Sequence, residues 1–394
     1  MAGTELTKLR VGVVDSHDPE DVTLGSGWSS SLTSALSEVV GEVVPVNAQL
    51  PGIANRVVYL ASVVMRLRAA DLRDVRGGAH RVSNSAFLGR PLTMSRRIVA
   101  SGRLRAAGGL HGIVQRGCDM RVAAQAPVVT FEDSTLLQAA RAYPWPHLQG
   151  LSQDELDRYA MRQRQIYHRV RAACVSSHWT ADSVVSDYHV DPARVHVVGL
   201  GKNHELSAVP RDFSMPRFLF VGMAWERKNG PAVLRAFARV RERWPQARID
   251  VVGLHPRLDE LGVRGHGPLS LADPVGRERL AALFARATAF VMPSLHEPTG
   301  TVYAEAGGAG IASIGTTNGG AATVIGAGGR VVDPLSLEAI ADAMLELSEP
   351  ATAAYLGALA QQHSRLFTWR KVAERLIRAM AIPGVDLTRL AAAL

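Results

Sequence analysis

The chain has 394 residues, a mean hydropathy of +0.05 and a net charge of +8. This length exceeds one ordinary hydrophobic core, so we expect two domains. No apolar run is long enough to span a bilayer, and the polar residues 1–10 lead directly into a first apolar strand, which argues against a membrane span and a signal peptide. With only Cys118 and Cys174, the chain also lacks a disulfide framework or a cysteine metal site, and we expect a cytoplasmic protein.

The positive charge is concentrated in one segment. Residues 56 to 121 include 13 Arg, no Lys and 3 Asp, a local net charge of +10. Such a patch favours an anionic partner, either a phosphorylated acceptor or an acidic membrane surface on the inner face of the membrane. The alternative is solvated arginine in an arginine-rich chain. No nucleic-acid-binding motif accompanies the charge, so we expect no nucleic acid partner.

Strands and helices alternate through the first half, which predicts a doubly wound α/β domain. The expected strands are 9–15, 43–46, 112–115, 127–130, 173–176 and 195–198. The expected helices are 29–40, 53–68, 92–107, 153–170 and 178–187. The helix at 53–68 is apolar over most of its surface, and we favour a core helix over one that rests on a lipid interface.

The loop after the first strand contains Gly25 and Gly27. Two glycines there would let the backbone approach a phosphate group of a donor. An ordinary tight turn explains the same pattern equally well.

A second candidate loop contains Glu132 and Asp133, directly after the strand at 127–130. Because α/β sheets place ligand groups at the carboxyl ends of their strands, both side chains are candidates for contacting an acceptor. Alternatively, Asp133 or Ser134 only caps the helix that begins near Leu136.

A proline-containing segment at 204–216 with little periodicity predicts a linker. We therefore expect a first domain at 1–206, a second at 207–368, and C-terminal helices at 369–394 that pack back toward the first domain. The expected strands of the second domain are 217–221, 249–252, 289–292, 311–314 and 330–332. The expected helices are 231–244, 274–286, 335–347, 351–366, 369–380 and a short one at 387–394.

The segment 290–312 combines an apolar strand, a proline-containing turn and a new helix. Glu297 lies in the turn, Glu305 lies eight residues later inside the helix, and the residues between them supply a hydroxyl N-cap candidate. Free N–H groups at such a helix start attract an anion. An anion site beside two carboxylates suits a ligand with phosphate and hydroxyl groups, such as a sugar nucleotide. The alternative is a surface turn whose acidic residues favour the helix N-terminus.

The chain resembles the retaining glycosyltransferases of family four over nearly its whole length. The most specific motifs are the Glu-x7-Glu pair, Glu297 and Glu305, and the loop FVGMAWERKNG at 220–230. Supporting motifs lie at 177–181, 187–197 and 367–376. The resemblance implies the GT-B fold, with two Rossmann-like doubly wound domains that face a central cleft. It also implies a hexosyltransferase that uses a nucleoside-diphosphate sugar, such as a UDP or GDP sugar, as co-substrate. The high Ala and Arg content separately indicates a GC-rich bacterial source.

The resemblance assigns roles to individual residues. Glu297 contacts the transferred sugar and orients it, while the backbone amides of Gly300 and Thr301 bind sugar hydroxyls. Glu305 binds the ribose hydroxyls, which suits a carboxylate that accepts two hydrogen bonds. In the family's usual account the acceptor hydroxyl attacks from the leaving-group face and the diphosphate accepts its proton; a short-lived covalent intermediate is the alternative, and the sequence does not decide between them.

The diphosphate is assigned to Lys228, with Arg227 as a candidate helper. A cation there stabilises the negative charge that develops on the leaving group in the transition state. No metal cofactor is then required. The resemblance also leaves a gap, because the family has an arginine where this chain has Met223; Lys202 and Arg227 are the candidate substitutes.

Other departures from the family are Thr299, where an aromatic residue is common, and the segment 319–323, which lacks a glutamate. For the histidine that often lies near the reacting sugar we assign neither His111 nor His147. Two alternatives therefore stay open: a non-catalytic or partner-dependent glycosyltransferase-like subunit, and a nucleotide-sugar epimerase. The sequence does not identify the acceptor, and natural products are among the candidates.

Overall fold

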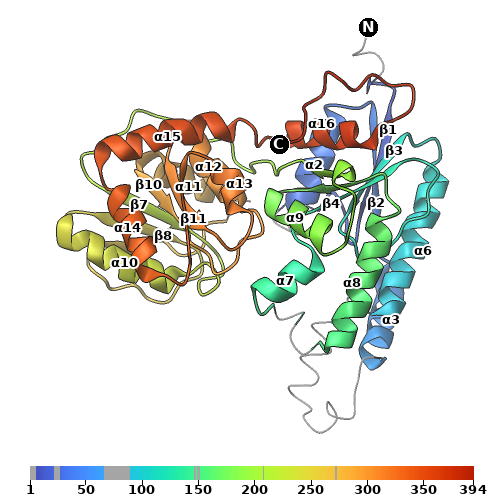
Figure 1. The fold of residues 1–394 in the computed structure, drawn as a ribbon, viewed down its shortest axis with the longest axis horizontal. Helices are drawn as coiled ribbons and strands as arrows, with labels where there is room; N and C mark the ends of the chain where they lie inside the picture. Colours follow the sequence, from blue (N-terminus) through green and yellow to red (C-terminus); the bar gives the residue numbers. More distant parts are fainter. Residues whose placement is uncertain are drawn as a thin grey trace. The chain divides into compact units, whose positions relative to one another are not determined.

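The computed structural model describes residues 6–21, 27–65, 89–145, 148, 151–206, 208–270 and 273–394. The chain forms two compact units (Figure 1). Unit 1 comprises Met1–Val198 and Trp369–Leu394, and unit 2 comprises Gly199–Thr368. The division falls at Gly199 rather than at residue 207, because the backbone of 199–206 bonds to unit 2. Lys202 N, for example, donates to Phe367 O at 3.1 Å.

Unit 1 contains a six-stranded parallel sheet in the order β2-β1-β3-β4-β5-β6. Its strands are β1 (Arg10–Asp15), β2 (Glu42–Asn47), β3 (Gly112–Arg116), β4 (Val128–Glu132), β5 (Ala172–Val175) and β6 (Val195–Val197). Its helices are α2 (Trp28–Ser37), α3 (Gly52–Val64), α6 (Arg90–Ala107), α7 (Leu136–Ala142), α8 (Gln153–Tyr167), α9 (His178–Ser186) and α16 (Trp369–Met380). Strands such as β1 are nearly continuous apolar runs because helices cover both faces of a parallel sheet.

Unit 2 contains a second parallel sheet in the order β12-β11-β10-β7-β8-β9. Its strands are β7 (Arg217–Val221), β8 (Arg248–Val252), β9 (Val263–Gly265), β10 (Ala289–Val291), β11 (Ala312–Thr316) and β12 (Gly329–Val332). Its helices are α10 (Gly230–Arg243), α11 (Pro274–Arg286), α12 (Thr301–Gly308), α13 (Ala321–Ile325), α14 (Leu337–Glu346) and α15 (Pro350–Ser364). The prediction of two doubly wound α/β domains is confirmed.

The C-terminal segment belongs to unit 1. Helix α16 contacts α2 and strands β3, β4 and β5 with its apolar face. Arg375 Nη1 donates to Val198 O at 2.9 Å, and Leu394 N donates to Val197 O at 2.8 Å. Both bonds join this segment to the end of β6.

Two sequence predictions about helices are wrong. Residues 387–394 form a turn and an extended tail instead of a helix. A helix would bond Leu394 N to Leu390 O. Instead, Leu394 N donates to Val197 O at 2.8 Å and Leu390 O accepts from Arg378 Nη1 at 2.8 Å. Arg375 Nε donates in the same way to Ala392 O at 2.9 Å. Helix α3 is not a core helix in its described part. Among its described residues Ser62 alone is buried, while an apolar stripe is exposed, made of Ile53, Val57, Leu60 and Val64.

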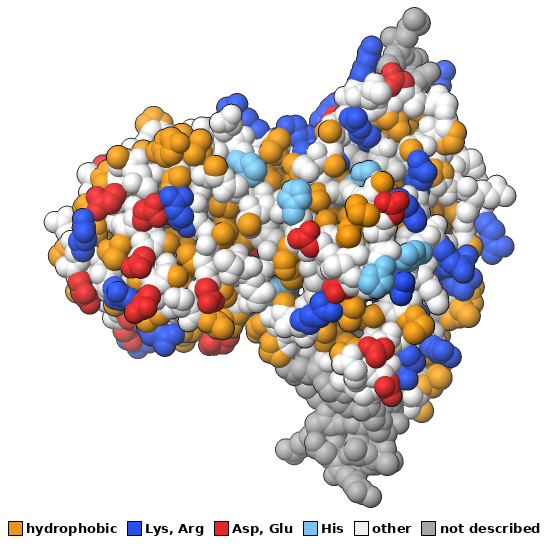
Figure 2. Space-filling view, viewed as in Figure 1, with side chains coloured by type: hydrophobic (Ala, Val, Ile, Leu, Met, Phe, Trp, Pro, Cys, Tyr) orange, Lys and Arg blue, Asp and Glu red, His pale blue; other side chains and the backbone are white. Residues whose placement is uncertain are grey.

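Charge is distributed unevenly between the units. Unit 2 has 17 Lys and Arg against 16 Asp and Glu, so unit 1 carries +7 of the net charge of +8. On the face drawn in Figure 2, acidic and basic side chains are interspersed over the unit that contains α10 and α14. Of the helices in the described residues, none is both long and apolar enough to cross a membrane.

Candidate functional site

The candidate site of unit 2 lies where the strand order reverses. From β7 the chain continues to β8 and β9 on one side, and β10 then returns to the other side of β7. Loops that follow β7 and β10 therefore diverge at the carboxyl ends of two neighbouring strands, the position where open α/β sheets bind ligands. The loop after β7 carries Lys228, and the loop after β10 carries Glu297.

The structure brings Lys228 and Glu297 together as a buried ion pair. Lys228 Nζ contacts Glu297 Oε2 directly. Ser294 Oγ donates to the same oxygen at 3.2 Å, and Arg227 Nη1 lies 3.8 Å from it. One carboxylate oxygen is thus surrounded by two cations and a hydroxyl group.

Backbone and amide contacts hold the two loops against each other. Leu295 N donates to Arg227 O at 2.8 Å. The Asn229 side chain donates to Pro293 O at 3.1 Å and to Pro334 O at 2.7 Å. The buried Asn229 therefore joins the β7 loop to the β10 loop, and the ion pair sits on a fixed frame.

A third loop, after β11, supports Glu297 through its backbone. Glu297 N donates to Asn318 O at 3.1 Å, and Gly320 N donates to Glu297 O at 3.0 Å. Gly319 has a φ of 135°, and a Cβ at this position would lie 1.9 Å from Glu297 O. Only glycine fits this close approach of two chains.

Local charge keeps Glu297 ionised. Burial alone would raise the pKa of its carboxyl, but the charges of Lys228 and Arg227 outweigh burial and hold the pKa below its usual value. Burial lowers the pKa of the neighbouring His296 to about 4, so its imidazole is neutral at physiological pH. The site accordingly presents two cations and one carboxylate.

Helix α12 begins directly after this cluster. Its N-cap is Gly300, with a left-handed φ of 79°, rather than a hydroxyl residue as the sequence suggested. The helix start leaves backbone N–H groups without an intrahelical acceptor, beginning at Thr301. Glu305 lies four residues after Thr301, so the two residues share one face of the helix, about 6 Å apart.

Glu305 has surroundings unlike those of Glu297. Its Oε1 accepts a hydrogen bond from Asn203 N at 3.2 Å. Burial raises the pKa of Glu305 to about 7, against the opposing effects of the backbone amides of Asn203 and His204 and the charge of Lys202. At neutral pH about half of the molecules thus carry a charged carboxylate at this position.

Unit 1 has a polar cluster at its own reversal of strand order, between β1 and β3. Asp15 ends β1 and is buried; Arg116 Nη1 lies 2.9 Å from its Oδ2, and Ser29 Oγ donates to the same oxygen. The Arg116 guanidinium also lies over the Trp28 ring, 5.6 Å from its centroid. Gly27, with a φ of 74°, is the N-cap of α2 beside this cluster. Gly25 lies outside the described residues.

Glu132 is buried beneath the loop rather than exposed on it. Cys118 Sγ donates to its Oε1 at 3.2 Å, and Gln163 Nε2 donates to its Oε2 at 3.2 Å. Burial raises the pKa of Glu132 to about 7. Its side chain therefore supports the loop from below.

Asp133 is not the helix cap that the sequence suggested, and neither is Ser134. Thr135 takes this position, because its hydroxyl accepts from Gln138 N at 3.1 Å and Gln138 Oε1 accepts from Thr135 N at 3.3 Å. This capping box leaves Ser134 on the wall of a cavity.

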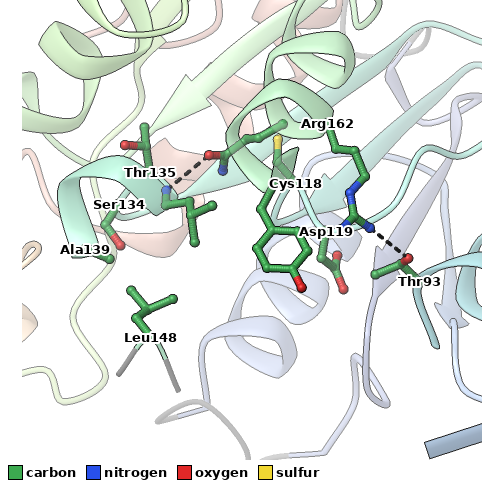
Figure 3. A pocket seen from close by; sticks show the side chains of 11 residues that line it. Thr93, Cys118, Asp119, Ser134, Thr135, Ala139, Leu148 and Arg162 are labelled. Atoms are coloured by element: carbon green, nitrogen blue, oxygen red, sulfur yellow. Dashed lines mark hydrogen bonds between the residues drawn. The ribbon is translucent and has the colours of Figure 1, made fainter. Parts of the chain in front are cut away.

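The cavity beside this loop has a volume of about 200 Å³ (Figure 3). Its polar wall includes Asp119 and Arg162, and Arg162 Nη1 donates to Thr93 Oγ1 at 3.4 Å. Asp119 is ion-paired to Arg96 at 2.8 Å. The apolar wall comes from Leu136, Ala139 and Leu148.

Comparison with known proteins identifies the unit that holds the ion pair. Residues 215–349 match the family model described as glycosyl transferases group 1. The second unit is a group 1 glycosyltransferase domain. The resemblance to family four is thereby confirmed at the level of the family.

Similar proteins extend the comparison beyond this domain. A D-inositol 3-phosphate glycosyltransferase of Streptomyces griseus is 31% identical over 236 residues, which are 48% of this chain and 49% of the relative. The chain thus spans about half the length of the curated relatives it matches. Sucrose-phosphate synthase from Thermosynechococcus elongatus has a TM-score of 0.61 at 18% identity, covering 94% of this chain and 98% of the synthase. A pneumococcal O-GlcNAc transferase in complex with UDP and GlcNAc has a TM-score of 0.50 at 13% identity, covering 73% and 60%. The fold is GT-B, as expected.

The resemblance places an arginine at the position of Met223, whose side chain is 56% exposed. Of the two candidate substitutes, Lys202 is ion-paired to Glu205 at 2.9 Å, beside Glu305. Arg227 lies in the Lys228 cluster and donates to His296 O at 2.8 Å. The geometry therefore favours Arg227 as the second cation near Lys228.

The sequence interpretation missed the Asp15–Arg116 pair in unit 1. Both residues end strands that flank the reversal of strand order, which is the signal that would have found them. His17, whose N donates to Asp15 Oδ1 at 3.2 Å, also lies at this edge. His111 precedes β3 at the opposite edge, where its Nδ1 accepts from Arg10 N, and His147 lies outside the described residues.

Proposed function

We propose that the chain is a retaining glycosyltransferase that moves a hexose-type sugar from a nucleoside-diphosphate donor to an acceptor hydroxyl. The observation that carries this proposal is the buried Lys228–Glu297 pair at the strand-order reversal, next to the start of α12. A cation, a carboxylate and a helix N-terminus in one place suit a ligand that joins a diphosphate to a sugar.

Lys228 supports departure of the diphosphate. The anomeric C–O bond breaks and its electron pair stays on the diphosphate oxygen. An ammonium group has three N–H donors, so Lys228 can bond Glu297 and a phosphate oxygen at once. Arg227, 3.8 Å from the Glu297 carboxylate, adds a second positive charge. Because the charges are held in place before reaction, they stabilise the transition state without reorganisation.

Glu297 faces the sugar. Its ionised carboxylate orients the hexose and stabilises the positive charge that develops at the anomeric carbon. The amides of Gly300 and Thr301 bind sugar hydroxyls, and Glu305 accepts bonds from the ribose hydroxyls. The acceptor hydroxyl forms the new bond on the face that the diphosphate leaves, and its proton passes to the diphosphate. None of these steps needs a metal ion.

The acceptor is assigned to the 200 Å³ cavity of unit 1. Its wall offers a guanidinium from Arg162, a carboxylate from Asp119 and hydroxyl groups from Thr93 and Ser134. This set suits a polyol that carries one anionic group, since hydroxyls bond to carboxylates and anions to guanidinium. The name of the Streptomyces relative describes an acceptor of this kind for that protein.

A transfer assay tests the proposal. The purified chain is incubated with UDP and GDP sugars and with phosphorylated polyols, and the product is analysed by NMR. We expect transfer with the anomeric configuration of the donor kept. If no donor releases its nucleoside diphosphate, the non-catalytic alternative is favoured. If the donor sugar changes its configuration without being transferred, the epimerase is favoured.

A further inference from the structure

Unit 1 has a second cavity, of about 440 Å³, away from the loops just described. It lies near the amino ends of β4 and β5. Pro127 and Val128 line it at the start of β4, and Arg171 lines it directly before β5. Arg171 N donates to Val128 O at 2.7 Å. The loop that carries Asp133 and Ser134 follows the carboxyl end of β4, so this cavity belongs to the opposite edge of the sheet.

Three arginines from two segments of the chain, the β3–β4 and α8–β5 connections, line this cavity. Arg121 follows β3, Arg169 follows α8, and Arg171 precedes β5. Among the described lining residues there is no Asp or Glu. The rest of the wall is mostly small and apolar, formed by Val122, Ala123, Ala124, Ala126, Ile166 and Val170.

Several exposed arginines of the chain pair with a carboxylate, which these three do not within the described residues. Arg141 is paired with Asp187 at 2.9 Å, Arg243 with Glu349 at 2.9 Å and Arg370 with Glu374 at 3.2 Å. In the part of the chain that the structure describes, no hydrogen bond or ion pair involves the guanidinium of Arg121, Arg169 or Arg171. Partial burial lowers the pKa of Arg121, and so do the positive charges of Arg169 and Arg97. The cavity thus concentrates positive charge without a counter-charge.

We propose that this cavity binds the phosphate group of an anionic ligand, at a site separate from sugar transfer. Guanidinium forks match phosphate oxygens in pairs, and three of them around one concave surface suit a dianion. The volume is within the range of small-molecule sites, and the apolar wall accommodates the organic part of the ligand. The phosphate comes either from a soluble phosphorylated molecule or from a lipid headgroup.

Two double variants of the full chain test the site. The first, Arg121→Gln with Arg169→Gln, removes two cavity cations. The matched control, Arg158→Gln with Arg164→Gln, removes two exposed arginines of α8 that do not line the cavity. Both change the net charge equally. Each is also made in a Lys228→Met, Glu297→Gln background, which removes the proposed donor-site cation together with its buried partner charge, so that pyrophosphate binding at the proposed donor site is separated from binding here.

Pyrophosphate is titrated calorimetrically, and binding to phosphatidylcholine vesicles with or without phosphatidic acid is measured by co-sedimentation. We expect the cavity variant to lose about tenfold or more in pyrophosphate affinity, since charged hydrogen bonds contribute about 1.5–3 kcal/mol each, while the control loses little. Parallel loss of binding to acidic vesicles identifies a lipid headgroup as the source, and unchanged vesicle binding identifies a soluble ligand. Equal losses in both variants, or no pyrophosphate binding in the folded Lys228→Met, Glu297→Gln chain, would overturn the proposal. Unchanged melting temperatures verify that both variants fold.

Discussion

The proposed role of Glu305 makes binding of a nucleotide sugar dependent on pH in a predictable direction. The pKa of its carboxyl is about 7 in the free protein, and the proposed contact with ribose hydroxyls needs the charged form. The carboxylate is therefore about one-tenth populated at pH 6 and about nine-tenths populated at pH 8. We expect affinity for a nucleotide sugar to fall about tenfold from pH 8 to pH 6, a loss of about 1.4 kcal/mol.

Isothermal titration with UDP and GDP sugars measures this effect. A nucleotide sugar is the suitable probe because, unlike a free nucleoside diphosphate, its phosphates do not titrate near neutral pH. Binding at pH 7 also releases a fraction of a proton, since the ligand favours the ionised carboxylate; titration in two buffers of different ionisation enthalpy counts it. Glu305→Gln is the control and should bind weakly with no pH dependence. A flat profile for the native chain, or the same slope in the variant, would refute the assignment of Glu305 to the ribose.

Further predictions concern the buried charges and the close backbone approach. Lys228→Met leaves the buried Glu297 carboxylate with Arg227, 3.8 Å away, as its remaining cation and should cost about 3 kcal/mol of stability. Adding Glu297→Gln should restore the melting temperature but not turnover, and failure to restore it would contradict the pairing. Gly319→Ala should lower both the melting temperature and turnover because its Cβ meets a backbone oxygen, whereas Gly267→Ala, with a φ of +65° but nothing within 4 Å, should cost only about 1–2 kcal/mol. The raised pKa of Glu132 means that the native state favours the protonated carboxyl. The stability that protonated Glu132 contributes is therefore fully present below about pH 4.5 and is lost as the pH rises through about 7. Glu132→Gln should therefore stabilise unit 1 by about 3 kcal/mol at pH 8 and little at pH 5, as melting curves at the two pH values would show.

Periodicity and strand–helix alternation predicted most of the fold. Parallel strands are apolar on both faces, so runs such as β7 are visible in the sequence. Helix α3 misled the same reasoning, because its apolar residues looked like core and its stripe is exposed among the described residues. The tail at 387–394 misled it too, since distant arginine side chains take its carbonyls and no local pattern reports them.

The contact between Lys228 and Glu297 lies where motif and topology coincide. The family resemblance named both residues, and the strand order explains why residues so far apart in sequence meet. Their direct pairing was not foreseen, because the sequence assigned one to the diphosphate and the other to the sugar. The different protonation of the two carboxylates, ionised Glu297 and half-protonated Glu305, could not be predicted from the sequence either, because it depends on the surroundings of each side chain in the fold.

The return of α16 to unit 1 has a consequence for synthesis on the ribosome. Unit 2 is inserted between β6 and this helix, so α16 is translated only after the whole of unit 2. Until then the face of β3, β4 and β5 that α16 covers stays open, and the nascent first unit exposes an apolar surface. Unit 2, by contrast, is one uninterrupted stretch and can fold as soon as it emerges. The later-encoded half of the molecule thus has the simpler route to its native state.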